Sequence, residues 1–181
     1  MVSNALDEGE DAGALMSTVS IAGGVAVAHE FKARITWTGA AKGPAVDYDS
    51  YSRSYLIEID GKPPLRGSSV PLYRGDPALY NPEDLLVAAL SACHLLWYLH
   101  LCTDAGISIS AYHDDAEGKM SRRDGKLAFS DVLLRPHVTI VKGDVDRAMA
   151  LHAAANAECF IANSVNFPVR HEPVISRAQG V

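Results

Sequence analysis

The sequence predicts a single α+β domain in which two helical segments interrupt a series of short strands. A chain of 181 residues has the size of one ordinary domain and is too short for two domains with separate cores. With 48% hydrophobic and 21% charged residues, it can bury a substantial core. Strand-like runs lie before, between and after the helical segments, and this order is typical of the α+β class.

Charge and cysteine content exclude several classes of protein. The formal net charge is −6, but four of the 22 acidic residues lie within the first 11 positions, so the remainder is nearly neutral and has no basic run. Nucleic acids and anionic membranes are therefore not expected partners. Three cysteines without CxxC spacing do not indicate a disulfide-stapled secreted domain. Because the acidic N-terminus also lacks the features of a signal peptide, we expect a cytoplasmic protein.

The chain divides into two parts at about residue 28. Residues 1–28 are small, acidic and glycine-rich, which predicts a flexible extension, and residues 29–181 form the predicted domain. Between Phe31 and Trp37 apolar and polar side chains alternate, as in a half-buried strand. Pro136 indicates an edge or a bulge in one of the later strands. Those strands are expected at residues 53–59, 107–113, 129–141 and 172–176.

The first helix is expected to begin after Asn81, which can cap it, with Pro82 at the first helical position. It should end before Gly106. Residues 85–102 are apolar with few exceptions, which predicts a helix that is buried on every side. A membrane span needs about 20 such residues, but two histidines lie within the stretch and no basic residues flank it. Burial in an oligomer, against a second copy of the chain, explains the pattern better.

The second helix is expected to begin near Asp144 and to run towards Cys159, with a stop around residues 166–168. Cys93 lies in the middle of the first helix, so the two helices could bring two thiols together. Cys102 follows Cys93 by nine positions, about 13.5 Å along a straight helix and half a turn around it, and cannot pair with it. From the residues alone, packing is the favoured role of Cys93 and Cys159, because free cysteines are often buried.

Residues 81–93 have the sequence NPEDLLVAALSAC, which resembles the signature of the OsmC/Ohr family of thiol peroxidases. In that family the Asn-Pro-Glu opens the central helix, and the reactive cysteine follows the glutamate by ten positions, as Cys93 follows Glu83. Cys159, in the run AECFIANSV, matches the family's resolving cysteine. The resemblance extends from about residue 31 to the end. It implies an intertwined homodimer with two long central helices enclosed by curved, mainly antiparallel sheets.

The resemblance also implies a reaction. The chain would be a cysteine-based peroxidase, an antioxidant enzyme of the oxidative stress response that reduces organic hydroperoxides to alcohols. Cys93 would become a sulfenic acid, Cys159 would resolve it as a disulfide, and an external dithiol would reduce that disulfide. The arginine that holds the thiolate, itself oriented by Glu83, would be Arg74 in LYRGDPALYNPE or, alternatively, Arg53 in YSRSYLIEI. We prefer Arg74 on the sequence. No cofactor and no metal is implied.

The surroundings of the reactive cysteine predict the size of the substrate. Its helix face also carries Leu86, Leu90 and Trp97, and Phe160 follows the second cysteine. An apolar approach of this kind favours bulky organic hydroperoxides over hydrogen peroxide.

Other functions remain open on the sequence. The main alternative is a non-enzymatic module on the same fold that binds an apolar ligand or senses oxidants. A hydrolase built from Cys93 and His100 is disfavoured because they lie about 10.5 Å apart along the helix, whereas a nucleophile and its base need about 3 Å. A zinc site lacks ligand pairs with the usual spacing. His94 stands where the family commonly has an aromatic residue, and both histidines are expected to be hydrogen-bonded core residues.

Overall fold

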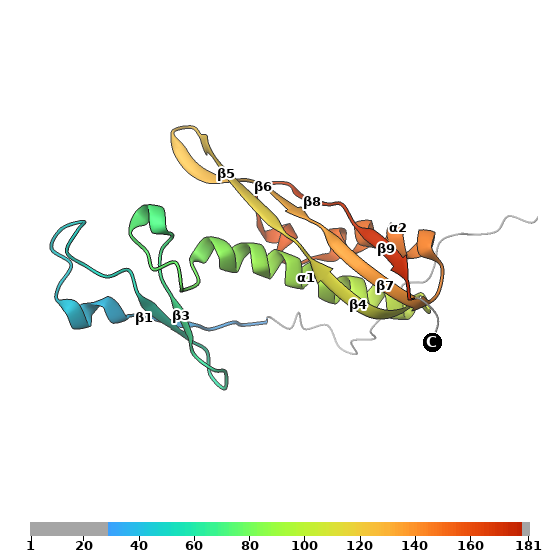
Figure 1. The fold of residues 1–181 in the computed structure, drawn as a ribbon, viewed down its shortest axis with the longest axis horizontal. Coiled ribbons are helices and arrows are strands. Elements are labelled where there is room, and N and C mark those ends of the chain that lie inside the picture. Colours follow the sequence, from blue (N-terminus) through green and yellow to red (C-terminus); the bar gives the residue numbers. More distant parts are fainter. Residues whose placement is uncertain (1–28, 179–181) are drawn as a thin grey trace, which may run out of the picture. The chain divides into compact units, whose positions relative to one another are not determined.

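The computed structural model describes residues 29–178, and residues from Ala33 onward form one compact unit (Figure 1). The predicted flexible extension, residues 1–28, lies outside the described residues.

Both predicted helices are confirmed. Helix α1 comprises Pro82–Asp104, and the side chain of Asn81 caps it by accepting a hydrogen bond from the backbone of Asp84 at 2.8 Å. Helix α2 comprises Val145–Glu158, with Asp144 as its cap. It ends earlier than the expected stop, and only a short 3-10 turn, Ala162–Ser164, follows. The two helices pack against each other.

The strands form three three-stranded sheets. Two of these sheets are mixed, because β8 pairs in parallel with β6, and β9 pairs in parallel with β7, while the remaining pairs in all three sheets are antiparallel. In order, the sheets consist of β1 (Arg34–Trp37), β2 (Tyr55–Glu58) and β3 (Leu65–Gly67); β4 (Ser108–Asp114), β7 (Pro136–Lys142) and β9 (Val174–Arg177); and β5 (Glu117–Arg123), β6 (Lys126–Leu134) and β8 (Val169–His171).

Several strands differ from the sequence-based expectation. The run 129–141 splits into β6 and β7 at Arg135, whose backbone N–H donates to the side chain of Asp114 at 2.6 Å instead of to a neighbouring strand. Pro136, which has no N–H to donate, begins β7. Strands β3, β5 and β8 were not predicted from the sequence. Strand β5 is exposed along its whole length, so its sequence carries no apolar alternation.

The core lies between the two helices and the β4–β7–β9 sheet. Side chains from α1, α2 and this sheet form one cluster, which includes Tyr98, Ala148, Val138 and Ile140. A second, smaller cluster joins the N-terminal half of α1 to β6 and contains Leu90, Val132 and Leu134. One face of α1 is therefore covered by its own chain.

The opposite face of α1 is not covered within the chain. Ala88, Ala92 and Leu96 are exposed at intervals of four residues, and the Leu96 side chain keeps 67% of its surface accessible. Strand β1, expected to be half-buried, is also exposed at all four residues. By length and composition alone α1 could cross a membrane, but in this fold it carries four buried residues that pack within the domain. A single chain therefore leaves one apolar face of α1 uncovered.

Candidate active site

The structure brings Cys93 and Cys159 together. Cys93 lies in the middle of α1 and is partly exposed, whereas Cys159 caps the C-terminus of α2 and is 1% exposed. The two side chains are neighbours, because the Cys93 thiol is among the groups that raise the pKa of Cys159. The backbone N–H of Ala162 also donates to the Cys159 sulfur at 3.4 Å. The packing of α1 against the end of α2 thus places a partly exposed thiol beside a buried one from a distant part of the chain.

The two thiols differ in their environment. Burial, and then the neighbouring Cys93 thiol, raise the pKa of Cys159 to about 11. Cys159 is therefore protonated at neutral pH, and the more accessible Cys93 is the candidate for attack on a substrate. Cys102 is fully buried, and burial raises its pKa as well. It lies on the same unbroken helix as Cys93, too far along the axis to form a disulfide with it.

Two aromatic side chains lie beside the cysteine pair. Trp97 stands one helical turn after Cys93, and its ring meets that of Phe160 edge to face, with centroids 5.4 Å apart. Phe160 is 68% exposed and thus accessible to a ligand. The other two expected substrate contacts belong to the core instead. Leu90 is completely buried in the second core cluster, and Leu86 packs against that cluster.

Glu83 lines a separate pocket of about 430 Å³ at the start of α1. Arg53 lines the same pocket, and its guanidinium lies over the ring of Tyr51 at 4.0 Å and donates to backbone carbonyl groups. Arg74, in contrast, is exposed and forms an ion pair with Asp49. Of the two candidate arginines, Arg53 is the one that shares a pocket with Glu83.

The Glu83 pocket and the cysteine pair are far apart within one chain. Because α1 is continuous from Pro82 to Asp104, the ten positions between Glu83 and Cys93 correspond to about 15 Å along the axis and about 80° around it. A single chain therefore presents two incomplete sites, one with the thiols and one with the acid and the arginine.

Two core histidines, His94 and His152, and the partly buried His171 form a cluster that was not predicted from the sequence. His94 Nε2 and His152 Nδ1 form a hydrogen bond of 2.9 Å, and the His171 ring stacks on His94 with centroids 5.7 Å apart. Burial, and then neighbouring histidines, lower the pKa of His94 to about 4 and that of His152 to about 3. The expectation of a core histidine is confirmed for His94. It is wrong for His100, which is exposed and faces Asp104 one turn away.

This histidine cluster should make the protein acid-sensitive. In the unfolded chain His94 and His152 bind protons below pH 6.5, whereas in the folded protein their lowered pKa values prevent this. Stability should be fully present above pH 6.5 and fall towards pH 4, by about 3 kcal/mol from His94 alone. Urea unfolding at pH 7.5 and pH 5 measures the loss. The control variant His100→Gln should show the same pH dependence as the unmodified protein. A free energy of unfolding that is the same at pH 7.5 and pH 5 would contradict the claim that His94 and His152 are uncharged in the folded protein.

Comparison with known proteins identifies the family. The model of the OsmC-like protein family matches residues 75–173. The structure of an OsmC-like protein of unknown function from Vibrio cholerae is 32% identical, with a TM-score of 0.75, and the match covers 81% of this chain and 100% of that one. The chain belongs to the OsmC/Ohr family. No match was found among curated proteins.

Two further structures share the fold of this OsmC-like chain at lower identity. An organic hydroperoxide resistance protein from Elizabethkingia anophelis is 17% identical, with a TM-score of 0.62, and the match covers 85% of this chain and 100% of that one. An organic hydroperoxide resistance protein, OsmC, from Legionella pneumophila is 21% identical, with a TM-score of 0.59, covering 82% and 97%. At these low identities, the similarity shows a shared fold only.

Proposed function

We propose that this OsmC-like protein is a thiol-dependent peroxidase that reduces organic hydroperoxides to alcohols. The observation that carries the proposal is that Cys93 and Cys159, two thiols from different helices, are neighbours and differ in exposure. The names of the structurally similar hydroperoxide resistance proteins support the substrate class. A reducing cytoplasm, where we expect the protein, would supply the dithiol that regenerates it.

The proposed cycle has three steps. The Cys93 thiolate attacks the terminal oxygen of the hydroperoxide, so that an S–O bond forms, the O–O bond breaks, and the leaving alkoxide takes up a proton to give the alcohol. The Cys159 sulfur then attacks the sulfur of the Cys93 sulfenic acid, forming a disulfide and releasing water. An external dithiol reduces the disulfide by exchange and becomes oxidised itself.

A positive charge near Cys93 is needed for the first step. A guanidinium stabilises a thiolate and can also stabilise the negative charge that develops on the leaving oxygen. We assign this role to Arg53, oriented by Glu83 through a charge-assisted hydrogen bond. Their common pocket supports this choice over Arg74, which is already paired with Asp49.

A second copy of the chain would complete the site. The apolar stripe of Ala88, Ala92 and Leu96 and the exposed strand β1 are the surfaces that an intertwined homodimer would cover. If two α1 helices pack antiparallel and cross near Ala88, midway between Glu83 and Cys93, the start of one lies beside the middle of the other. Glu83 and Arg53 of one chain would then serve Cys93 of its partner.

Steady-state turnover tests the proposed function. The protein should reduce cumene hydroperoxide for many cycles when a dithiol such as dihydrolipoamide is present, and oxidation of the dithiol should match alcohol formation. A protein that consumes one equivalent of hydroperoxide and then stops, even with excess dithiol, would instead be the non-enzymatic binding or sensing module.

The aromatic pair beside the thiols should set the substrate preference. Trp97→Ala should lower kcat/KM for cumene hydroperoxide by about tenfold, because a bulky organic group loses its apolar contact, and should affect hydrogen peroxide much less. Leu127→Ala, which removes a half-exposed side chain on the distant strand β6, is the matched control. Equal losses for both peroxides would contradict an apolar substrate contact at Trp97.

A further inference from the structure

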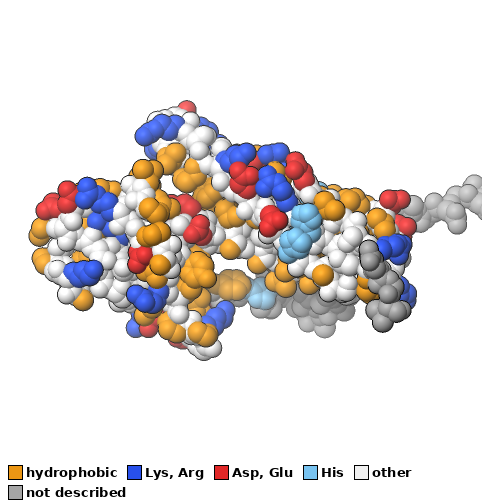
Figure 2. All heavy atoms as spheres, in the orientation of Figure 1, with side chains coloured by type: hydrophobic (Ala, Val, Ile, Leu, Met, Phe, Trp, Pro, Cys, Tyr) orange, Lys and Arg blue, Asp and Glu red, His pale blue; other side chains and the backbone are white. Residues whose placement is uncertain are grey.

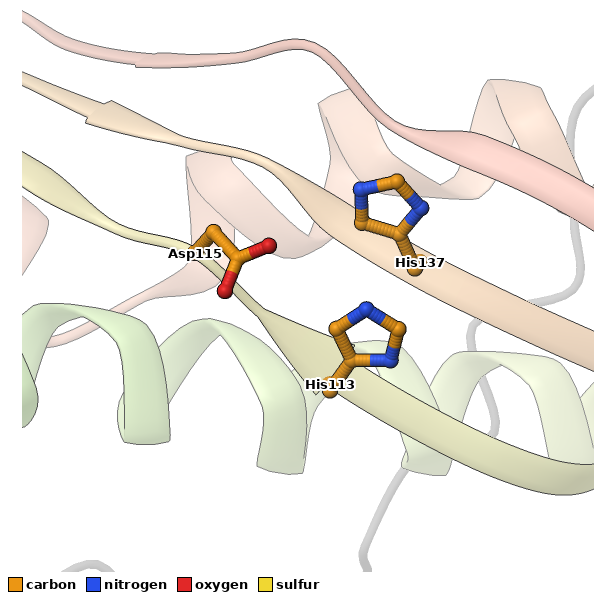
Figure 3. Close-up of side chains that lie close together, drawn as sticks. All are labelled: His113, Asp115 and His137. Atoms are coloured by element: carbon orange, nitrogen blue, oxygen red, sulfur yellow. The ribbon is translucent and has the colours of Figure 1, made fainter.

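The outer face of the β4–β7 pair carries a cluster of potential metal ligands. His113 on β4 lies directly opposite His137 on β7 in the antiparallel register, and Asp115 follows two positions after His113. One ligand atom from each side chain lies within 4.8 Å of the other two (Figure 3). Figure 2 shows histidine side chains at the molecular surface over these strands. The cluster is accessible to ions from solvent.

Strand alternation fixes the direction of all three side chains. Asp114 accepts a hydrogen bond from α1 on the inner face, so His113 and Asp115 on either side of it project outward. Val138 is buried in the core, and its neighbour His137 consequently projects outward as well. The rings of the two histidines are almost parallel, with an interplanar angle of 2° and centroids 4.6 Å apart. The sheet thus holds two imidazoles side by side before any ion is bound.

The ligand atoms of this cluster are available. In the described part of the chain, the two imidazoles and the Asp115 carboxylate form no hydrogen bonds or ion pairs, whereas the neighbouring carboxylate of Glu117 is paired with Arg135 at 2.9 Å. Arg135 is therefore paired with a different acid. It also donates to the backbone carbonyl of Asp115 at 3.3 Å, a contact that leaves the Asp115 carboxylate free. One nitrogen of each imidazole and one carboxylate oxygen thus lie close together, without another partner among the described residues.

We propose that His113, His137 and Asp115 bind a divalent transition metal ion, with Zn²⁺ as the reference ion. Zn²⁺ accepts imidazole nitrogen and carboxylate oxygen at about 2.0–2.2 Å, so the ligand atoms must approach to about 3.3 Å from one another, which rotations of these side chains permit. Three protein ligands leave a fourth position open to water. Mg²⁺ requires oxygen ligands in an octahedral arrangement and does not fit. The site is independent of the proposed peroxidase reaction, because it lies on the sheet face opposite the helices.

Calorimetric titration with Zn²⁺ tests the site. The titration uses a Cys93→Ser/Cys159→Ser background, because the dithiol could itself bind zinc. One ion per chain should bind, and His113→Ala, His137→Ala and Asp115→Asn should each weaken binding by at least about tenfold. His100→Ala is the matched control, since it removes an exposed imidazole beside a carboxylate outside the cluster, and should leave the affinity unchanged. Mg²⁺ should not compete.

A thermal measurement provides a second readout that does not depend on the titration. Because the ion would link β4 to β7 only in the folded state, Zn²⁺ should raise the Tm of the background protein and not that of its His113→Ala/His137→Ala variant. Both substitutions lie on the solvent face of the sheet, so circular dichroism should show an unchanged fold. Zinc affinity that survives the double substitution, or no binding at millimolar zinc, would overturn the proposal.

Discussion

Cys93→Ser should abolish the turnover of cumene hydroperoxide, lowering kcat by at least about a thousandfold, because a serine hydroxyl does not replace a thiolate in the attack on the O–O bond. Cys159→Ser should behave differently. It should still reduce one equivalent of hydroperoxide and then stop, leaving Cys93 as a sulfenic acid that a cyclic 1,3-diketone can trap. The difference follows from the partial exposure of Cys93 and the raised pKa of the buried Cys159.

Cys102→Ser is the matched control for both variants. Its thiol is on the same helix as Cys93 but lies in the core, so the substitution should reduce stability modestly and leave turnover intact. Sulfenic acid trapping with peptide mapping identifies the oxidised residue in each protein. Loss of turnover in Cys102→Ser without unfolding would contradict the assignment of Cys159 as the resolving thiol.

Mixed dimers of two inactive variants should regain activity. Glu83→Ala lacks the acid, and Cys93→Ser lacks the thiol, so homodimers of either variant should be inactive. A mixed dimer would combine an intact Cys93 from one chain with an intact Glu83 from the other. The physical reason is the continuous α1 helix, which separates the two groups by about 15 Å within each chain.

Random pairing after co-refolding makes half of the dimers mixed, and each mixed dimer has one complete site of two, so about a quarter of the unmodified activity should return. Mixing the folded variants without refolding is the control and should give no activity. Verified mixed dimers without activity would show that the site lies within one chain, and the role given to Glu83 would then have to be abandoned.

Local signals in the sequence were sufficient to predict the two helices and to select the two candidate thiols. Asn81 with Pro82 marks the start of α1, Asp144 marks the start of α2, and both caps appear in the structure. The positions of the cysteines on two predicted helices left Cys93 and Cys159 as the candidate pair, and these side chains are neighbours in the structure. These features depend on short stretches of chain and on the regular geometry of a helix.

Features that depend on contacts between distant segments were not predictable. Strand β5 is exposed on both faces, and β8 has only three residues, so neither carries a periodic pattern. The contact between His94 and His152 requires the packing of α1 on α2, and nothing in the local sequence of His171 indicates that it joins them. The choice between the arginines likewise depends on how the segment before β2 folds against the start of α1.

A single-turnover reaction followed by disulfide mapping tests the peroxidase mechanism most directly. The reduced protein receives one equivalent of cumene hydroperoxide without a reductant, and the peptides are separated under non-reducing conditions. The mechanism predicts one equivalent of alcohol, one disulfide joining Cys93 to Cys159 within a chain, and a free thiol at Cys102. Alcohol formed without loss of the two thiols, or a disulfide that includes Cys102, would contradict it.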